Sequence, residues 1–138
     1  MLACRDRCYP LLAADDTHYY EKGEACLSWI MVQAEDNSPA SLLRAIRRGD
    51  FYATQGPEVH LEKTGNGYTV RCSPVSEIVF LSNATWSPRV FEGEALCEAY
   101  YEPLPYERYL RVQVKDAEGR LAWTNCTLLP RETEKDNK

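Results

Sequence analysis

From Phe51 onward the sequence alternates apolar and polar residues with a period of two, the pattern of half-buried β-strands. In VHLEK, for example, Val59 and Leu61 share one face. The segment GNG at 65–67 signals a tight turn, and similar turn signals recur between the later apolar runs. Six to eight short strands spaced in this way predict an antiparallel β-sandwich over residues 51–130.

One helix is predicted before these strands, over residues 38–48. The Ser38 hydroxyl can cap its N-terminus, Pro39 suits the first helical position, and Gly49 stands where a left-handed residue ends a helix. The apolar stripe of this helix consists of Leu42, Leu43, Ala45 and Ile46. The arginines that face away from the stripe, Arg44, Arg47 and Arg48, are interpreted as a solvated face.

The N-terminal part of the chain has a different pattern. Residues 9–14 and 25–34 are apolar runs without alternation, which predict short buried strands. With the helix they suggest α/β material over residues 1–50, so we expect a domain boundary near residue 50. The charged segment 131–138 is predicted to be a disordered tail.

Asp16 and His18 directly follow the first apolar run. Residues two apart share a side of an extended chain, and a carboxylate with an imidazole suits zinc, manganese or iron. Two ligands alone bind a metal weakly, so this pattern by itself favours an Asx-type turn at Asp15 and Asp16 with His18 on the surface. The other histidine, His60, is interpreted as a solvated residue on the polar face of a strand.

Charge and cysteine usage limit the classes of function. The net charge of −5 argues against a nucleic-acid-binding protein, and no apolar run is long enough to span a bilayer. No export signal is recognised, so we expect a cytoplasmic location and reduced thiols for the six cysteines. The tryptophans and tyrosines can form a sugar-stacking surface, although aromatic residues at strand spacing are more typical of a core; they include Trp29, Trp86, Trp123, Tyr100 and Tyr101.

Five segments, in order, carry a family resemblance: YPLLAADDTHYY, WIMVQAE, SLLRAIRRGDFYATQGPEV, CSPVSEIVFLSN and RYLRVQVKDAEGRLAWTN. Together, over about residues 9 to 127, they resemble the C-terminal portion of bacterial PHP-domain proteins, the polymerase and histidinol phosphatase superfamily of metal-dependent phosphoesterases. The resemblance implies that residues 1–50 are a remnant of a distorted α/β barrel. It also implies that the fold is mainly β (α+β), with the helix and this remnant preceding the antiparallel sandwich.

The same resemblance implies a function. The family binds two or three divalent metal ions, its last ligand motif is an Asp-x-His, and here this motif is Asp16 with His18. The earlier motifs, which begin with a His-x-His, are absent from this sequence. Cys126 also departs from the family, which tends to carry proline there. The chain would therefore be a fragment of a phosphate-ester hydrolase, catalytically incomplete alone, with no catalytic residue that we can assign.

Three readings of the chain follow, and whether it is itself an enzyme stays open. The first is the incomplete phosphoesterase fragment, whose partner is the missing N-terminal portion or a second copy of the chain. The second is a stand-alone β-sandwich that binds a ligand or a protein without catalysis. The third is an active enzyme in which a partner chain supplies the missing metal ligands. Loss of metal binding on replacing Asp16 and His18 separates the second reading from the others.

Overall fold

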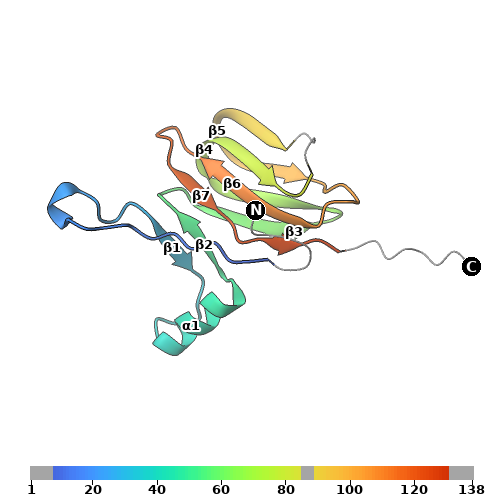
Figure 1. Ribbon diagram of the computed structural model, residues 1–138. Coiled ribbons are helices and arrows are strands. Elements are labelled where there is room, and N and C mark those ends of the chain that lie inside the picture. The colour runs from blue at the N-terminus through green and yellow to red at the C-terminus, as the bar shows by residue number, and fades with distance from the viewer. Residues whose placement is uncertain (1–7, 85–88, 131–138) are drawn as a thin grey trace, which may run out of the picture.

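Eight antiparallel strands form one curled sheet in the computed structural model, which describes residues 8–84 and 89–130 (Figure 1). The strands are β1 (Trp29–Val32), β2 (Phe51–Thr54), β3 (Val59–Thr64), β4 (Gly67–Leu81), β5 (Val90–Tyr101), β6 (Tyr109–Lys115), β7 (Leu121–Trp123) and β8 (Thr127–Leu128). Their order is β1-β2-β7-β6-β4-β3, with β5 paired to β4 and β8 to β6. The prediction of a mainly β, antiparallel fold with a helix is therefore confirmed.

Strand β4 organises the sheet because it pairs with three other strands. Strand β5 follows one edge of β4 along most of its 15 residues. The other edge pairs first with β3, over 67–72, and then with β6, over 77–81. Register shifts between Arg71 and Glu77 mark the irregularity that separates these two stretches. The sheet can therefore curl, bringing β3 round toward the strands beyond β6.

The core lies inside this curl and follows the predicted alternation. Leu110, Val112 and Val114 point inward from β6 and are fully buried. Phe80 of β4 stacks on Tyr101 of β5, with ring centroids 5.2 Å apart. Tyr101 is therefore a core residue, as aromatic residues at strand spacing usually are. Trp86 lies outside the described residues.

Helix α1 (Pro39–Arg48) connects β1 to β2 and has the predicted ends. The Ser38 hydroxyl accepts a hydrogen bond from the Ser41 amide, at 3.3 Å. Gly49 has φ 84°, a left-handed conformation that glycine adopts without steric cost, and its amide bonds back to the last turn. The helix prediction is therefore confirmed at both ends.

The N-terminal segment corrects the prediction of a buried strand at 9–14. Residues 8–18, which we call the arm, form an extended chain that pairs with no strand among the described residues. Tyr9 is 50% and Leu12 62% exposed. The strand predicted over 25–34 is also shorter, because only Trp29–Val32 pairs, with β2. An apolar run becomes a buried strand only where it pairs with neighbouring strands, and among the described residues no strand pairs with 9–14.

The cysteines correct a second prediction. Cys8 and Cys126 form a disulfide that joins the arm to the segment between β7 and β8, with 5.4 Å between their Cα atoms. The prediction of reduced thiols is therefore wrong for this pair. The sequence gave no sign that the two cysteines are close, because they lie 118 residues apart. Cys26, Cys72 and Cys97 are free thiols, as predicted. Cys4 and the predicted disordered tail, 131–138, lie outside the described residues.

Candidate functional site

The arm places Asp16 and His18 on one side of an extended chain. From Leu11 to His18, exposed residues alternate with partly covered ones, and both Asp16 and His18 fall on the exposed side. Their side chains are 100% and 66% exposed, and Asp16 Oδ1 lies 3.9 Å from His18 Nδ1. The structure thus brings the two predicted ligand residues together and leaves both open to solvent.

A hydrogen bond sets which ring nitrogen of His18 is available. His18 Nδ1 lies 2.8 Å from the backbone oxygen of Asp16. A carbonyl oxygen can only accept, so Nδ1 carries the proton and donates it. In the neutral ring the lone pair is then on Nε2, and histidines that bind metals commonly hold their second nitrogen in this way.

Asp15, to which the sequence assigned no ligand role, organises the loop that follows the arm. Its carboxylate accepts hydrogen bonds from the backbone amides of Cys26, Leu27 and Ser28, the last two at 2.8 and 2.6 Å. Three consecutive amides bound to one carboxylate thus fix the backbone at 26–28, directly before β1. The sequence does not predict this role, because no spacing rule relates an aspartate to backbone amides that lie 11 to 13 residues further along the chain.

Glu24 fixes the other half of this loop. Its carboxylate accepts hydrogen bonds from the amides of His18 and Tyr19, both at 3.0 Å. The backbone oxygen of Glu24 accepts a third bond, from the Thr17 hydroxyl at 2.9 Å. The backbone on both sides of His18 is therefore held, and the position of the exposed pair is defined by the loop.

No larger metal-ligating group accompanies the pair. Across residues 8–84 and 89–130, no three His, Cys, Asp or Glu side chains converge to hold a metal ion. The pair offers one carboxylate and one imidazole, fewer ligands than the three that catalytic metal sites usually take from a protein.

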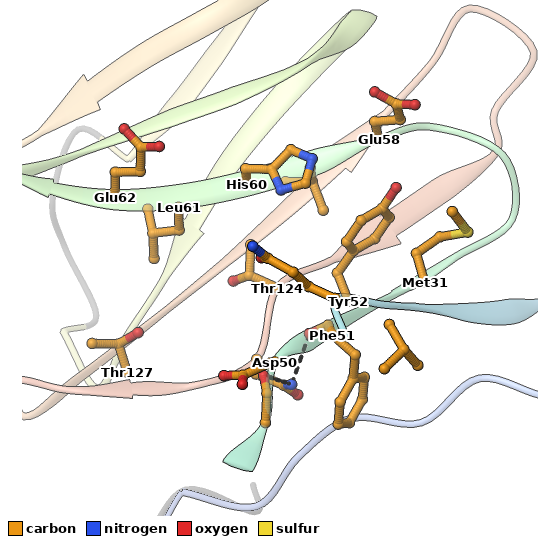
Figure 2. Close-up of a pocket in the computed structure, with 15 residues that line it drawn as sticks. Met31, Asp50, Phe51, Tyr52, Glu58, His60, Leu61, Glu62, Thr124 and Thr127 are labelled. Atoms are coloured by element: carbon orange, nitrogen blue, oxygen red, sulfur yellow. Dashed lines mark hydrogen bonds between the residues drawn. The ribbon is translucent and has the colours of Figure 1, made fainter. Parts of the chain in front are cut away.

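A cavity of about 690 Å³ lies at a different place, along β3 (Figure 2). One wall is formed by Glu58 and the β3 residues 59–62, and the opposite wall includes Thr124 and Thr127. Tyr52, Met31 and other residues at the facing ends of β1 and β2 close one end. The cavity wall therefore combines apolar side chains with carboxylates from parts of the chain whose proximity the sequence did not predict.

Tyr52 and His60 pack edge to face inside this cavity, with ring centroids 5.3 Å apart and an interplanar angle of 78°. Burial, and to a lesser degree the charge of Glu58, raise the pKa of the Tyr52 hydroxyl. The phenol therefore keeps its proton at neutral pH and can donate a hydrogen bond. His60 is exposed, as predicted, yet its ring forms part of the cavity wall.

The comparisons with known proteins identify no relative. No protein-family profile, no curated protein and no solved structure matches the chain. Within the described residues, no helix has the length and apolar character needed to cross a membrane.

Proposed function

We propose that the chain is the C-terminal portion of a PHP-type metal-dependent phosphoesterase, in which Asp16 and His18 supply two ligands to a divalent-metal site. The observation that carries this proposal is the Asp16–His18 pair. Both side chains lie on the exposed side of the arm, and the bond from Nδ1 to the Asp16 carbonyl leaves Nε2 as the ring nitrogen of His18 that is available to a metal. A carboxylate and an Nε2 nitrogen together suit Zn²⁺, Mn²⁺ or Fe²⁺.

In this proposal residues 1–50 are the remnant of a PHP-type barrel and residues 51–130 an accessory β-sandwich. Large apolar side chains left exposed on the arm, the loop after it, β1 and α1 support a missing covering layer. They are Tyr9, Leu12, Tyr19, Leu27, Trp29, Met31 and Leu43. In Figure 1 this part of the chain extends away from the rest of the sheet. The layer that covers it would also supply the remaining metal ligands, either from the missing N-terminal portion or from a partner chain.

The proposed chemistry is the hydrolysis of a phosphate ester. When bound, divalent metals at such a site activate water and neutralise the charge that develops on the phosphoryl group. The part played by this chain is to hold the Asp16 carboxylate and the His18 imidazole in a fixed relation. The Asp15 and Glu24 carboxylates support the backbone next to the pair, because they accept hydrogen bonds from the loop amides of Leu27 and Ser28 and from the amides of His18 and Tyr19. The chain alone is therefore expected to bind metal without completing the reaction.

Calorimetry with Zn²⁺ and with Mn²⁺ tests the proposal. We expect the wild type to bind weakly, because the pair supplies only two ligands, and the Asp16→Ala/His18→Ala double variant to lose that binding. His60→Ala is the matched control, because it removes the other histidine and leaves the arm intact. Absent binding, or binding that the double variant retains, would overturn the metal site and favour a stand-alone binding module.

The second candidate function is such a module, which binds a ligand or a protein without catalysis. The observation that favours it is the cavity along β3, which is lined by residues of the sheet and includes neither Asp16 nor His18. This candidate predicts binding that is indifferent to the double replacement in the arm.

A further inference from the structure

Strand β3 has one unpaired edge. Among the described residues β3 pairs only with β4, from Val59 opposite Cys72 to Thr64 opposite Gly67. Ser73 donates its amide proton to the Glu58 oxygen at 3.2 Å, which fixes the phase of the antiparallel hydrogen-bond pattern. In that phase Glu58, His60 and Glu62 direct their backbone groups toward β4. The N–H and C=O groups of the residues between them point away from β4.

This free edge borders the cavity of about 690 Å³. Five consecutive residues, Glu58 to Glu62, line the cavity, although their side chains alternate between the two faces of the strand. Only a space that runs along the edge of β3 touches all five. The opposite wall includes Thr124 and Thr127, which flank the irregular segment between β7 and β8 (Figure 2). The cavity is thus a seam at which the curled sheet does not close.

The side chains along the seam differ between the two faces of β3. Val59 is buried and Leu61 is partly buried against the core, so the inner face is apolar. Glu58, His60 and Glu62 are exposed on the outer face. Glu62 forms an ion pair with Arg71, with 3.0 Å between the guanidinium and the carboxylate, while no ion pair among the described residues involves Glu58. The seam therefore offers apolar contact on its inner side and negative charge on its outer side.

We propose that this seam binds an extended peptide as an added antiparallel strand, with apolar residues on its inner face and lysine or arginine residues on its outer face. The backbone of the peptide would pair with the free N–H and C=O groups of Val59, Leu61 and Lys63, as in other cases of strand addition. Its apolar side chains would extend the core beside Val59 and Leu61. Its basic side chains would lie near Glu58 and Glu62. This proposal does not depend on the metal site.

A synthetic peptide tests the pairing. The probe is a seven-residue peptide of alternating lysine and valine, blocked at both ends and carrying a fluorophore at one of them. Its binding to the full chain is followed by fluorescence anisotropy. In an antiparallel pair the residues that exchange hydrogen bonds have side chains on the same face. The valines would therefore donate to β3, so methylating the valine amides should weaken binding about tenfold more than methylating the lysine amides, the loss expected for one to two hydrogen bonds. Equal effects of the two methylations would overturn strand addition.

Variants of β3 test the site and the charge. Glu58→Lys/Glu62→Lys should weaken binding of the lysine peptide, while Glu92→Lys/Glu94→Lys on β5 is the matched control. Leu61→Pro removes an amide that points away from β4, and an edge strand tolerates proline at such a position. This variant should therefore weaken binding of the probe. On binding of the probe, the amides of Val59, Leu61 and Lys63 should become protected from hydrogen exchange in the wild type. Protection elsewhere, or equal binding of a peptide with glutamate in place of lysine, would overturn the proposal.

Discussion

The amide of Leu11 donates a hydrogen bond to Asn125 Oδ1 at 3.0 Å, joining residues 114 apart in the chain. The amide nitrogen of the same Asn125 side chain donates to the backbone oxygens of Gly49 and Phe51, at 2.9 and 2.8 Å. One side chain thus connects the arm, the end of helix α1 and the start of β2. The arm that carries Asp16 and His18 is held to the sheet by few contacts, and this is one of them.

Replacing Asn125 with alanine should destabilise the protein by about 2 kcal/mol, because partly buried backbone groups lose their partners. Urea unfolding measures the change, and hydrogen exchange at Leu11 should become faster. Asn37→Ala, at an exposed position before the helix, is the control and should change the free energy of unfolding by less than about 0.5 kcal/mol. A similar loss for both variants would contradict the role given to Asn125.

The disulfide between Cys8 and Cys126 should contribute about 2–4 kcal/mol, because it closes a long loop in the unfolded chain. Cys126→Ser should lower the free energy of unfolding by that amount, and a reductant should lower that of the wild type equally. Cys97→Ser, which replaces an exposed free thiol, is the control. Peptide mapping without reduction should recover a fragment linking Cys8 to Cys126, and its absence would refute the pairing.

Asp15→Ala should open the loop at 26–28, since three amides lose their common acceptor. We expect hydrogen exchange at Cys26, Leu27 and Ser28 to accelerate by about tenfold or more, as for loss of about 1.4 kcal/mol of local stability. Asp15→Asn keeps one acceptor oxygen and should give an intermediate effect. Unchanged protection at these three amides would show that other contacts hold the loop.

Asp116 makes stability depend on pH at the turn between β6 and β7. Burial alone would raise its pKa, but hydrogen bonds from the Arg120 backbone and guanidinium, the Arg120 charge and the Glu118 amide hold the pKa below its usual value. As the pH falls, the Asp116 carboxylate therefore binds a proton first in the unfolded state, at a pKa of about 3.9. The stabilisation is present above that pH and is lost as the pH falls through the lower pKa of the folded state.

Asp116→Asn should consequently reduce the free energy of unfolding at pH 7 and flatten its decline in acid. Urea unfolding between pH 7 and pH 3 measures both effects. Glu102→Gln, which removes an exposed charge after β5, is the control for a change in net charge. An acid decline as steep in the Asp116→Asn variant as in the wild type would contradict this explanation.

Local rules predicted much of the fold. The helix followed from Ser38, Pro39 and Gly49, and each residue has the predicted role at a helix end. The inward set on β6 followed from strict alternation, because a strand has only two faces. The GNG turn lies between β3 and β4, with a left-handed Gly65 at φ 59°. Such features depend on neighbours in the chain, which the sequence displays directly.

The remaining features depend on residues that are far apart. The arm looked like a buried strand because Leu11, Leu12 and Ala13 are apolar, but no strand in the described part of the chain pairs with them. Neither the disulfide nor the cavity has a sequence signature, because each requires knowledge of how the sheet curls. The proximity of Asp16 and His18 was predictable from their spacing. The hydrogen bonds from three amides to Asp15 were not predictable, because they depend on how the side chain of Asp15 meets residues 26–28 in the folded chain.

The way the arm is attached also orders events during synthesis. Residues 8–11 are synthesised 102 to 118 residues before their partners Arg111, Asn125 and Cys126. At about 5–20 residues per second, the arm waits several seconds or longer before any of these contacts can form. The segment that carries Asp16 and His18 is thus synthesised several seconds before the residues that attach the arm to the sheet.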